Sequence, residues 1–132
     1  MTTAASISSR RALLEAELAR FLPLLAGPGG AERVILFGSF ARGEDVADSD
    51  LDLVVVKRTS LPFWRRVAEV RRLLKPRIAA DVMVYTPEEL EQLARERPFV
   101  RDEILGRGRV IYERARFPAG YPESPKRTGL WR

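Results

Sequence analysis

A glycine-serine pair and two aspartates, set between two short apolar runs, constrain the fold of this chain most strongly. Residues 34–37 lead directly into Gly38-Ser39, and residues 53–56 directly follow Asp52. Short apolar runs bounded by turn residues predict buried strands. Because side chains alternate faces along a strand, Asp50 and Asp52 are expected to project to the same side.

Two carboxylates held close together on one face predict a cation site. Like charges at short range disfavour ionisation, and hard divalent cations such as Mg²⁺ take carboxylate oxygens as ligands. The Gly38-Ser39 pair suits a strand-to-helix turn, where free backbone N–H groups and the helix dipole can receive phosphate. Gly38 as a simple tight turn and Ser39 as a simple N-cap are the alternatives, and both are compatible with phosphate binding at this turn.

Asp81 is the third candidate carboxylate, in the middle of an otherwise apolar predicted strand over residues 78–85. A carboxylate in such a segment is costly unless it is paired or bound to metal. The alternative to a metal ligand is an ion pair with an arginine. Asp81, Met83 and Tyr85 are expected to share one face of this strand.

The alternation of helical and strand patterns predicts an α/β (α+β) fold, with a small mixed β-sheet of about four strands and flanking helices. Thr86 and Glu89 form a predicted capping box around Pro87, so Glu88 and Glu89 are assigned to helix initiation. Four arginines on the helix that begins at Thr59 or Ser60 are expected to lie largely outward, on a solvated face: Arg65, Arg66, Arg71 and Arg72. Helices are predicted over residues 9–25, in a short segment that begins at 39, from 59 or 60 to 75, from 87 to 95, and in a shorter piece that ends at 105. Strands are predicted over residues 33–37, 50–56, 78–85 and 110–112.

The spacing of these residues carries a family resemblance. Gly38-Ser39, ten intervening residues and Asp50-x-Asp52 resemble the signature of the DNA polymerase β-like nucleotidyltransferase superfamily. Residues 38–43 together with residues 49–53 resemble its minimal nucleotidyltransferase branch, and the resemblance covers residues 31–113. It implies the polymerase β-like fold, Mg²⁺ as cofactor and transfer of a nucleoside monophosphate from ATP, or another nucleoside triphosphate, to a hydroxyl group.

The resemblance also implies residue roles. Asp50 and Asp52 would bind Mg²⁺, and Asp81 would complete the catalytic metal triad near the acceptor hydroxyl. Gly38 and Ser39 would hold the β- and γ-phosphates. Arg42 could contact the triphosphate or instead pair with Glu44 or Asp48.

Minimal nucleotidyltransferases of this kind are commonly paired with a small helical HEPN-domain protein as a toxin–antitoxin system. The resemblance therefore implies an antitoxin that transfers AMP to a tyrosine of that toxin. A non-catalytic nucleotide-binding or toxin-neutralising subunit is the alternative, and a small-molecule nucleotidyltransferase remains open within the enzyme class. A homo-oligomer is also plausible, because small sheets with exposed edges often gain a partner.

The length and the charge of the chain limit its domain organisation and its possible partners. A chain of 132 residues predicts one domain: a nucleotidyltransferase domain over residues 1–114 and a flexible basic C-terminal tail over residues 115–132. The net charge is +5, but residues 114–132 hold five basic residues and one acidic residue, so a near-neutral body argues against a nucleic-acid partner. The chain has no cysteine and no histidine, which leaves proton transfer to carboxylates, lysine, tyrosine or water. Short apolar runs predict no membrane span, and a cytoplasmic location is expected.

Overall fold

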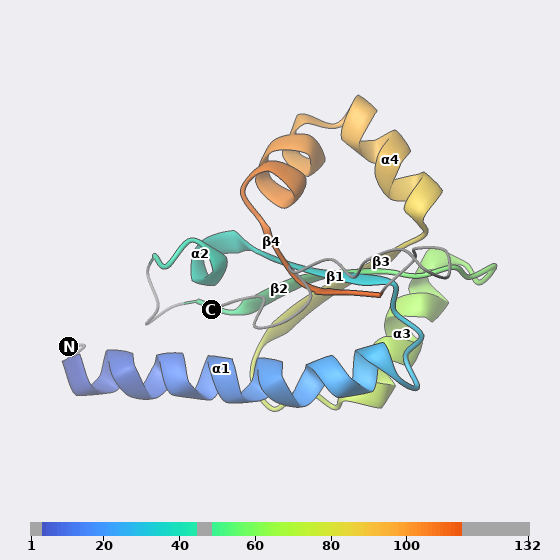
Figure 1. Cartoon of the computed structure of the whole chain (residues 1–132). Helices are drawn as coiled ribbons and strands as arrows, with labels where there is room; N and C mark the ends of the chain where they lie inside the picture. Colours follow the sequence, from blue (N-terminus) through green and yellow to red (C-terminus); the bar gives the residue numbers. More distant parts are fainter. Residues whose placement is uncertain (1–3, 45–48, 115–132) are drawn as a thin grey trace, which may run out of the picture.

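The computed structural model of the chain describes residues 4–44 and 49–114, and the side chains of the first helix from Ser9 onward. The predicted tail and most of the predicted loop over residues 44–49, Asp48 included, lie outside the described residues. In chain order (Figure 1), the elements are α1 (Ala4–Ala26), β1 (Arg33–Phe37), α2 (Gly38–Ala41), β2 (Leu51–Val56), α3 (Phe63–Leu74), β3 (Ala80–Tyr85), α4 (Pro87–Glu96), the π-helix η2 (Val100–Gly106) and β4 (Arg109–Glu113).

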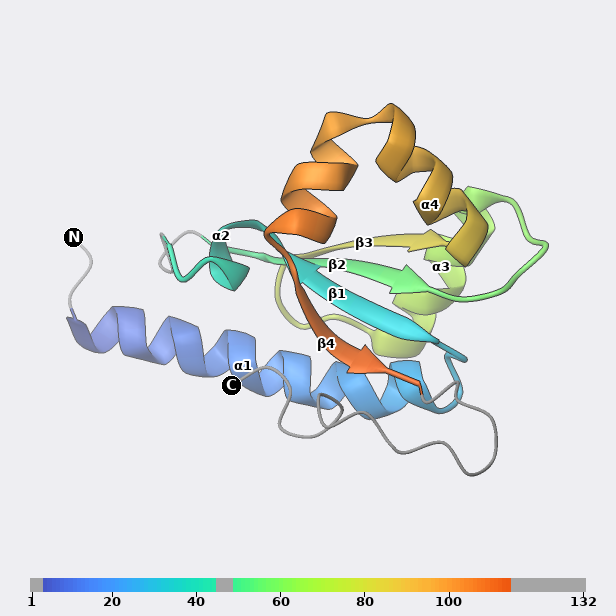
Figure 2. The same cartoon turned by 45° about the horizontal axis from the view of Figure 1, so that its top comes forward.

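The strands form one mixed sheet in the order β3-β2-β1-β4, as Figure 2 shows. β1 pairs antiparallel with both β2 and β4, whereas β2 pairs parallel with β3. The prediction of a small mixed sheet with flanking helices is confirmed. β2, which begins directly after Asp50, lies inside the sheet between β1 and β3.

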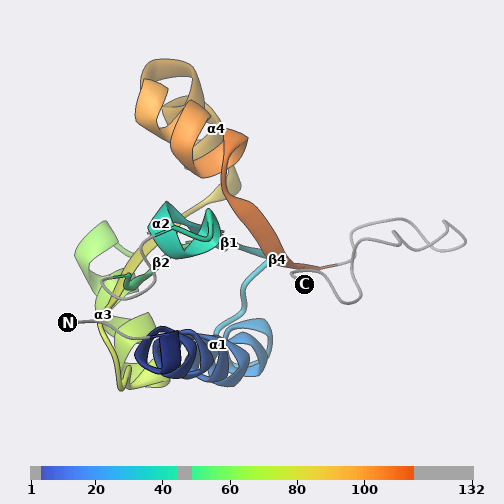
Figure 3. The same ribbon diagram turned by 90° about the vertical axis from the view of Figure 1, so that its left-hand side faces the viewer.

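Helices cover both faces of the sheet (Figures 1 and 3). α1 and α3 lie against one face, where α1 buries a stripe of apolar side chains: Leu14, Leu18, Phe21 and Leu25. α4 and η2 lie against the other face, over a smaller apolar cluster that includes Phe37. The chain thus buries both sides of its central strands, as their unbroken apolar runs require.

Helix α3 begins later than predicted, at Phe63 instead of Thr59 or Ser60. Pro62 holds an extended conformation at the N-cap position, and the Thr59 hydroxyl accepts the Leu61 N–H in a local turn. Since a residue before proline is pushed out of the helical region, Leu61 cannot belong to the helix. The capping box of α4 is confirmed, because Thr86 and Glu89 exchange both expected hydrogen bonds.

One of the four arginines predicted to point outward does not. Arg66 is only 9% exposed, and its guanidinium donates to both carboxylate oxygens of Glu89, at 2.6 and 3.1 Å. It also donates to the carbonyl of Leu61, at 2.7 Å, and to that of Val84. The prediction for Arg66 was wrong because the residue lies one helical turn before the buried Val70, on the same face of α3.

Across the described residues, no helix combines the length and the apolar character that a membrane crossing requires.

Candidate active site

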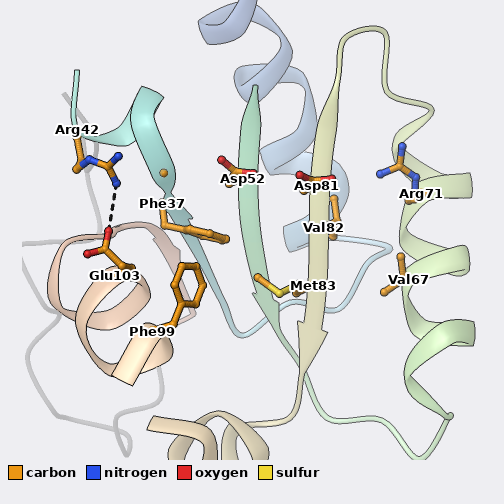
Figure 4. A pocket seen from close by; sticks show the side chains of 11 residues that line it. Phe37, Arg42, Asp52, Val67, Arg71, Asp81, Val82, Met83, Phe99 and Glu103 are labelled. Atoms are coloured by element: carbon orange, nitrogen blue, oxygen red, sulfur yellow. Dashed lines mark hydrogen bonds and ion pairs between the residues drawn. The ribbon is translucent and has the colours of Figure 1, made fainter. Parts of the chain in front are cut away.

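Two of the three predicted carboxylates meet through strand register. Asp52 on β2 and Asp81 on β3 are direct partners in the parallel ladder. Both lie on the face of the sheet that carries Met83 and the α4–η2 layer, and Figure 4 shows them side by side. The two carboxylates therefore form the centre of the site.

Asp50 lies just before β2 and interacts with the first helix. Its carboxylate is 3.6 Å from Nη2 of Arg10, which also donates to the carbonyl of Ser49 at 2.7 Å. The Nε atom of Arg10 is buried without a hydrogen-bond partner among the described residues. Sequence analysis assigned no role to Arg10, although it shares the buried stripe of α1 with Leu14 at a spacing of four residues.

Asp52 is the carboxylate that its surroundings perturb most. Burial, the charges of Asp81 and Asp50, and a hydrogen bond with Asp81 together raise the pKa of Asp52 to about 6, against a small opposing effect of Arg42. An aspartate with this pKa is still largely ionised at neutral pH. The site thus holds negative charge that its own arginines do not neutralise.

Gly38 lies against the central carboxylate. Its φ is +84°, in the left-handed region that favours glycine. A Cβ atom at this position would collide with Oδ2 of Asp52. Gly38 follows Phe37, the antiparallel partner of Asp52, so the turn into α2 begins directly beside this carboxylate.

Ser39 and Ser49 connect the turn to the start of β2. Their hydroxyl oxygens lie 2.8 Å apart, and Ser49 also donates to the carbonyl of Glu44, at 3.1 Å. Since a hydroxyl has one proton to donate, Ser39 is the donor of the bond between the two serines. Ser49 thus bonds locally at the entry to β2, and the Ser39 hydroxyl proton is already engaged.

Arg42 pairs with carboxylates on both sides. It donates to Glu44 at 3.1 Å and to Glu103 of η2 at 3.3 Å, the contact drawn in Figure 4. The pairing with Glu44 is one of the alternatives left open by the sequence. The contact with Glu103 was not predicted, because it depends on how η2 packs beside α2.

Gly38, Arg42, Asp52 and Asp81 line one cleft of about 690 Å³. Phe37 and Phe99, in edge-to-face contact at 6.1 Å, and Met83 form its apolar wall. Arg71 closes the far side, donating to the carbonyl of Ala80 at 2.6 Å (Figure 4). Arg71 was predicted to lie on a solvated face, with no part in the site.

The residues fit a divalent cation in part. Asp52 and Asp81 present adjacent carboxylates whose repulsion a cation would relieve. Within residues 4–44 and 49–114, however, no group of three acidic, histidine or cysteine side chains is arranged to hold a metal ion. Asp50, the third predicted ligand, is ion-paired with Arg10.

Comparisons with known proteins identify the family to which the chain is similar. The family described as "Polymerase beta, Nucleotidyltransferase" matches residues 25–117. The chain is 32% identical over 84 residues to a protein of Methanocaldococcus jannaschii named as a candidate protein adenylyltransferase, with 64% of this chain and 81% of that protein covered.

A solved structure shares the fold. The crystal structure of a candidate nucleotidyltransferase from Sulfolobus solfataricus superposes with a TM-score of 0.63 at 20% identity, covering 86% of this chain and 93% of the other.

Proposed function

This chain belongs to the polymerase β nucleotidyltransferase family, and on that premise we propose that it transfers AMP from ATP to a hydroxyl group of another protein. The acceptor oxygen forms a bond to the α-phosphorus, the bond from that phosphorus to the bridging oxygen breaks, and pyrophosphate leaves. The chain is a nucleotidyltransferase by its family.

The observation that supports it is the pairing of Asp52 with Asp81 beside the Gly38 turn. Asp52 and Asp81 would hold Mg²⁺, and Asp50 would join them after leaving Arg10. Bound there, Mg²⁺ would supply charge neutralisation for the phosphates and for the attacking and leaving oxygens. Asp81, on the β3 side, would accept the proton of the acceptor hydroxyl, which suits a chain without histidine.

The turn at Gly38 would receive the β- and γ-phosphates. The first N–H groups of a helix lack intrahelical acceptors, and α2 begins at Gly38. Ser39 would donate its hydroxyl proton to the phosphates after its hydrogen bond with Ser49 breaks. Arg42 would leave Glu44 and Glu103 and bind the triphosphate. Each of these side chains has a local partner to leave, so nucleotide binding would rearrange this turn.

A protein acceptor is supported by the name of the Methanocaldococcus jannaschii relative. We propose a tyrosine hydroxyl on a small helical HEPN-domain toxin, with this chain acting as the antitoxin that silences it by adenylylation. The competing function is a binding subunit that neutralises the toxin without turnover.

Calorimetric titration of ATP with and without Mg²⁺, on the wild type and on Asp52→Asn, tests the first step. Binding that needs Mg²⁺ and is lost in the variant is expected. A mass increase of one AMP on a co-expressed helical toxin, absent with Asp81→Asn, is expected next. If the toxin is neutralised equally well by Asp50→Asn and Asp52→Asn variants with no mass change, the binding-subunit function replaces the enzymatic one.

A further inference from the structure

An apolar groove opens from the cleft along β3. Its volume is about 430 Å³, and Met83 and Phe99 line both the groove and the cleft. Phe63, Tyr85 and Arg97 also line the groove. We refer to the surface formed by Phe63, Met83, Tyr85, Arg97 and Phe99 as the β3 groove.

The β3 groove exposes aromatic surface. Phe63 is 42% exposed and Phe99 is 55% exposed, and the Phe63 ring lies 5.5 Å from that of Tyr85. The Tyr85 hydroxyl lies 3.5 Å from Sδ of Met83, so it points along the strand toward the cleft. Exposed aromatic side chains that adjoin a reaction centre are typical of a surface that binds a ligand or partner.

Arg97 adds a positive charge to this surface. Its side chain is exposed and forms no ion pair with any described residue. By contrast, Arg95 in the last turn of the preceding helix α4 pairs with Glu91, and Arg101 pairs with Asp102. A guanidinium without a carboxylate partner beside aromatic rings favours a ligand that carries a carboxylate.

We propose that the β3 groove is the docking site of the acceptor protein and takes a short acidic segment with an aromatic side chain. This inference rests on the proposed function, in which Asp81 faces the acceptor. Asp81, Met83 and Tyr85 share one strand face, so the cleft and the groove together run about 13 Å from Asp81 to Tyr85. That length matches about four residues of extended peptide. It exceeds the footprint of a nucleobase, which also needs no carboxylate-binding arginine.

Synthetic copolymers provide the probe, since the acceptor is unidentified. We expect poly(Glu,Tyr) to bind the full chain in calorimetry more tightly than poly(Glu,Ala) or poly(Lys,Tyr) does. Arg97→Glu should weaken poly(Glu,Tyr) binding at least about tenfold while leaving the affinity for ATP with Mg²⁺ unchanged. The matched controls Arg95→Glu and Trp64→Ala, the latter removing a 70% exposed ring outside the groove, should bind as the wild type does.

Three results would overturn the proposal: equal binding of poly(Glu,Tyr) by Arg97→Glu, equal binding of poly(Glu,Ala) by the wild type, or loss of ATP affinity in Arg97→Glu, which would assign the groove to the nucleotide. AMP transfer is measured separately on the same copolymer. Binding that depends on Arg97 without any transfer would sink the proposed enzymatic function and leave the docking site standing. If the wild type transfers AMP and Arg97→Glu has the same KM for the copolymer, the enzymatic function would stand and the docking site would be refuted.

Discussion

Asp52 and Asp81 lie directly opposite each other in the ladder between β2 and β3, with burial and the Asp81 charge raising the pKa of Asp52 to about 6. In the unfolded chain this aspartate has a pKa near 3.8. Between these two values the folded chain binds more protons than the unfolded chain. The contribution of Asp52 to the free energy of unfolding without metal therefore falls as pH rises from about 4 to about 6.

Asp52→Asn should remove this pH dependence in EDTA. At pH 7 the variant should gain up to about 3 kcal/mol in the free energy of unfolding, the upper limit set by the pKa difference. Urea unfolding at pH 4, 5, 6 and 7 measures it. Excess Mg²⁺ should stabilise the wild type and not the variant. The variant reports how the other titrating carboxylates change the free energy of unfolding between pH 4.5 and pH 7, and this change is subtracted. If the wild type in EDTA is then no less stable at pH 7 than at pH 4.5, the assigned repulsion is contradicted.

Gly38→Ala should damage the site beyond its effect on the backbone. Gly38 and Gly43 both have positive φ, +84° and +73°, so alanine strains either turn by about 1–2 kcal/mol. Only at Gly38 does the added Cβ meet Asp52, since nothing lies within 4 Å of one at Gly43. We expect both variants to lose stability and only Gly38→Ala to lose ATP binding in the presence of Mg²⁺, by at least about tenfold. Equal binding by the two variants would show that the Gly38–Asp52 contact is not needed.

Arg10→Ala should release Asp50 from α1. The pair is partly exposed, so its loss should cost about 0.5–1 kcal/mol of stability without metal. Because Arg10 and a cation would compete for the same carboxylate, Mg²⁺ should bind the variant several-fold more tightly in calorimetry. Arg11→Ala, at the exposed neighbouring position, should change neither quantity. Weaker Mg²⁺ binding by Arg10→Ala would instead show that Arg10 orients Asp50 for the metal.

The sheet and its central carboxylates could be predicted because their signals are local. Alternation along the strands put Asp52 on one face, and Asp81 stood out in an apolar strand; the ladder then made them neighbours. The start of α3 was missed because Pro62 acts on Leu61, a short-range signal that the expected serine or threonine cap obscured.

The arginines were missed for a different reason. Arg10 precedes Leu14, and Arg66 precedes Val70, by one helical turn, so helical periodicity already placed both on buried faces. A charged residue on a buried stripe needs a partner from another element. Which partner it meets, Asp50 or Glu89, depends on tertiary packing that no local pattern contains.

Glu17→Ala should destabilise the fold strongly, although Glu17 lies outside the cleft. Glu17 is 5% exposed, and its carboxylate accepts hydrogen bonds from the Arg20 guanidinium, at 2.9 Å, and from the backbone N–H of Arg77, at 2.5 Å. Arg20 in turn donates to the carbonyl of Leu74, so the pair fastens α1 to the end of α3.

Removing one member of a buried pair typically costs about 3–5 kcal/mol, and we expect a loss near 3 kcal/mol because Arg20 stays partly exposed. Glu15→Ala, on the exposed face of the same helix, should stay within about 0.5 kcal/mol of the wild type. The hydrogen bond from Arg20 lowers the pKa of Glu17, so its contribution is present above pH 4.5 and is lost as pH falls below that value. Urea unfolding at pH 7 and pH 3 should therefore show a smaller gap between Glu17→Ala and the wild type at pH 3. A gap that stays constant would mean that Glu17 acts through packing and not through its charge.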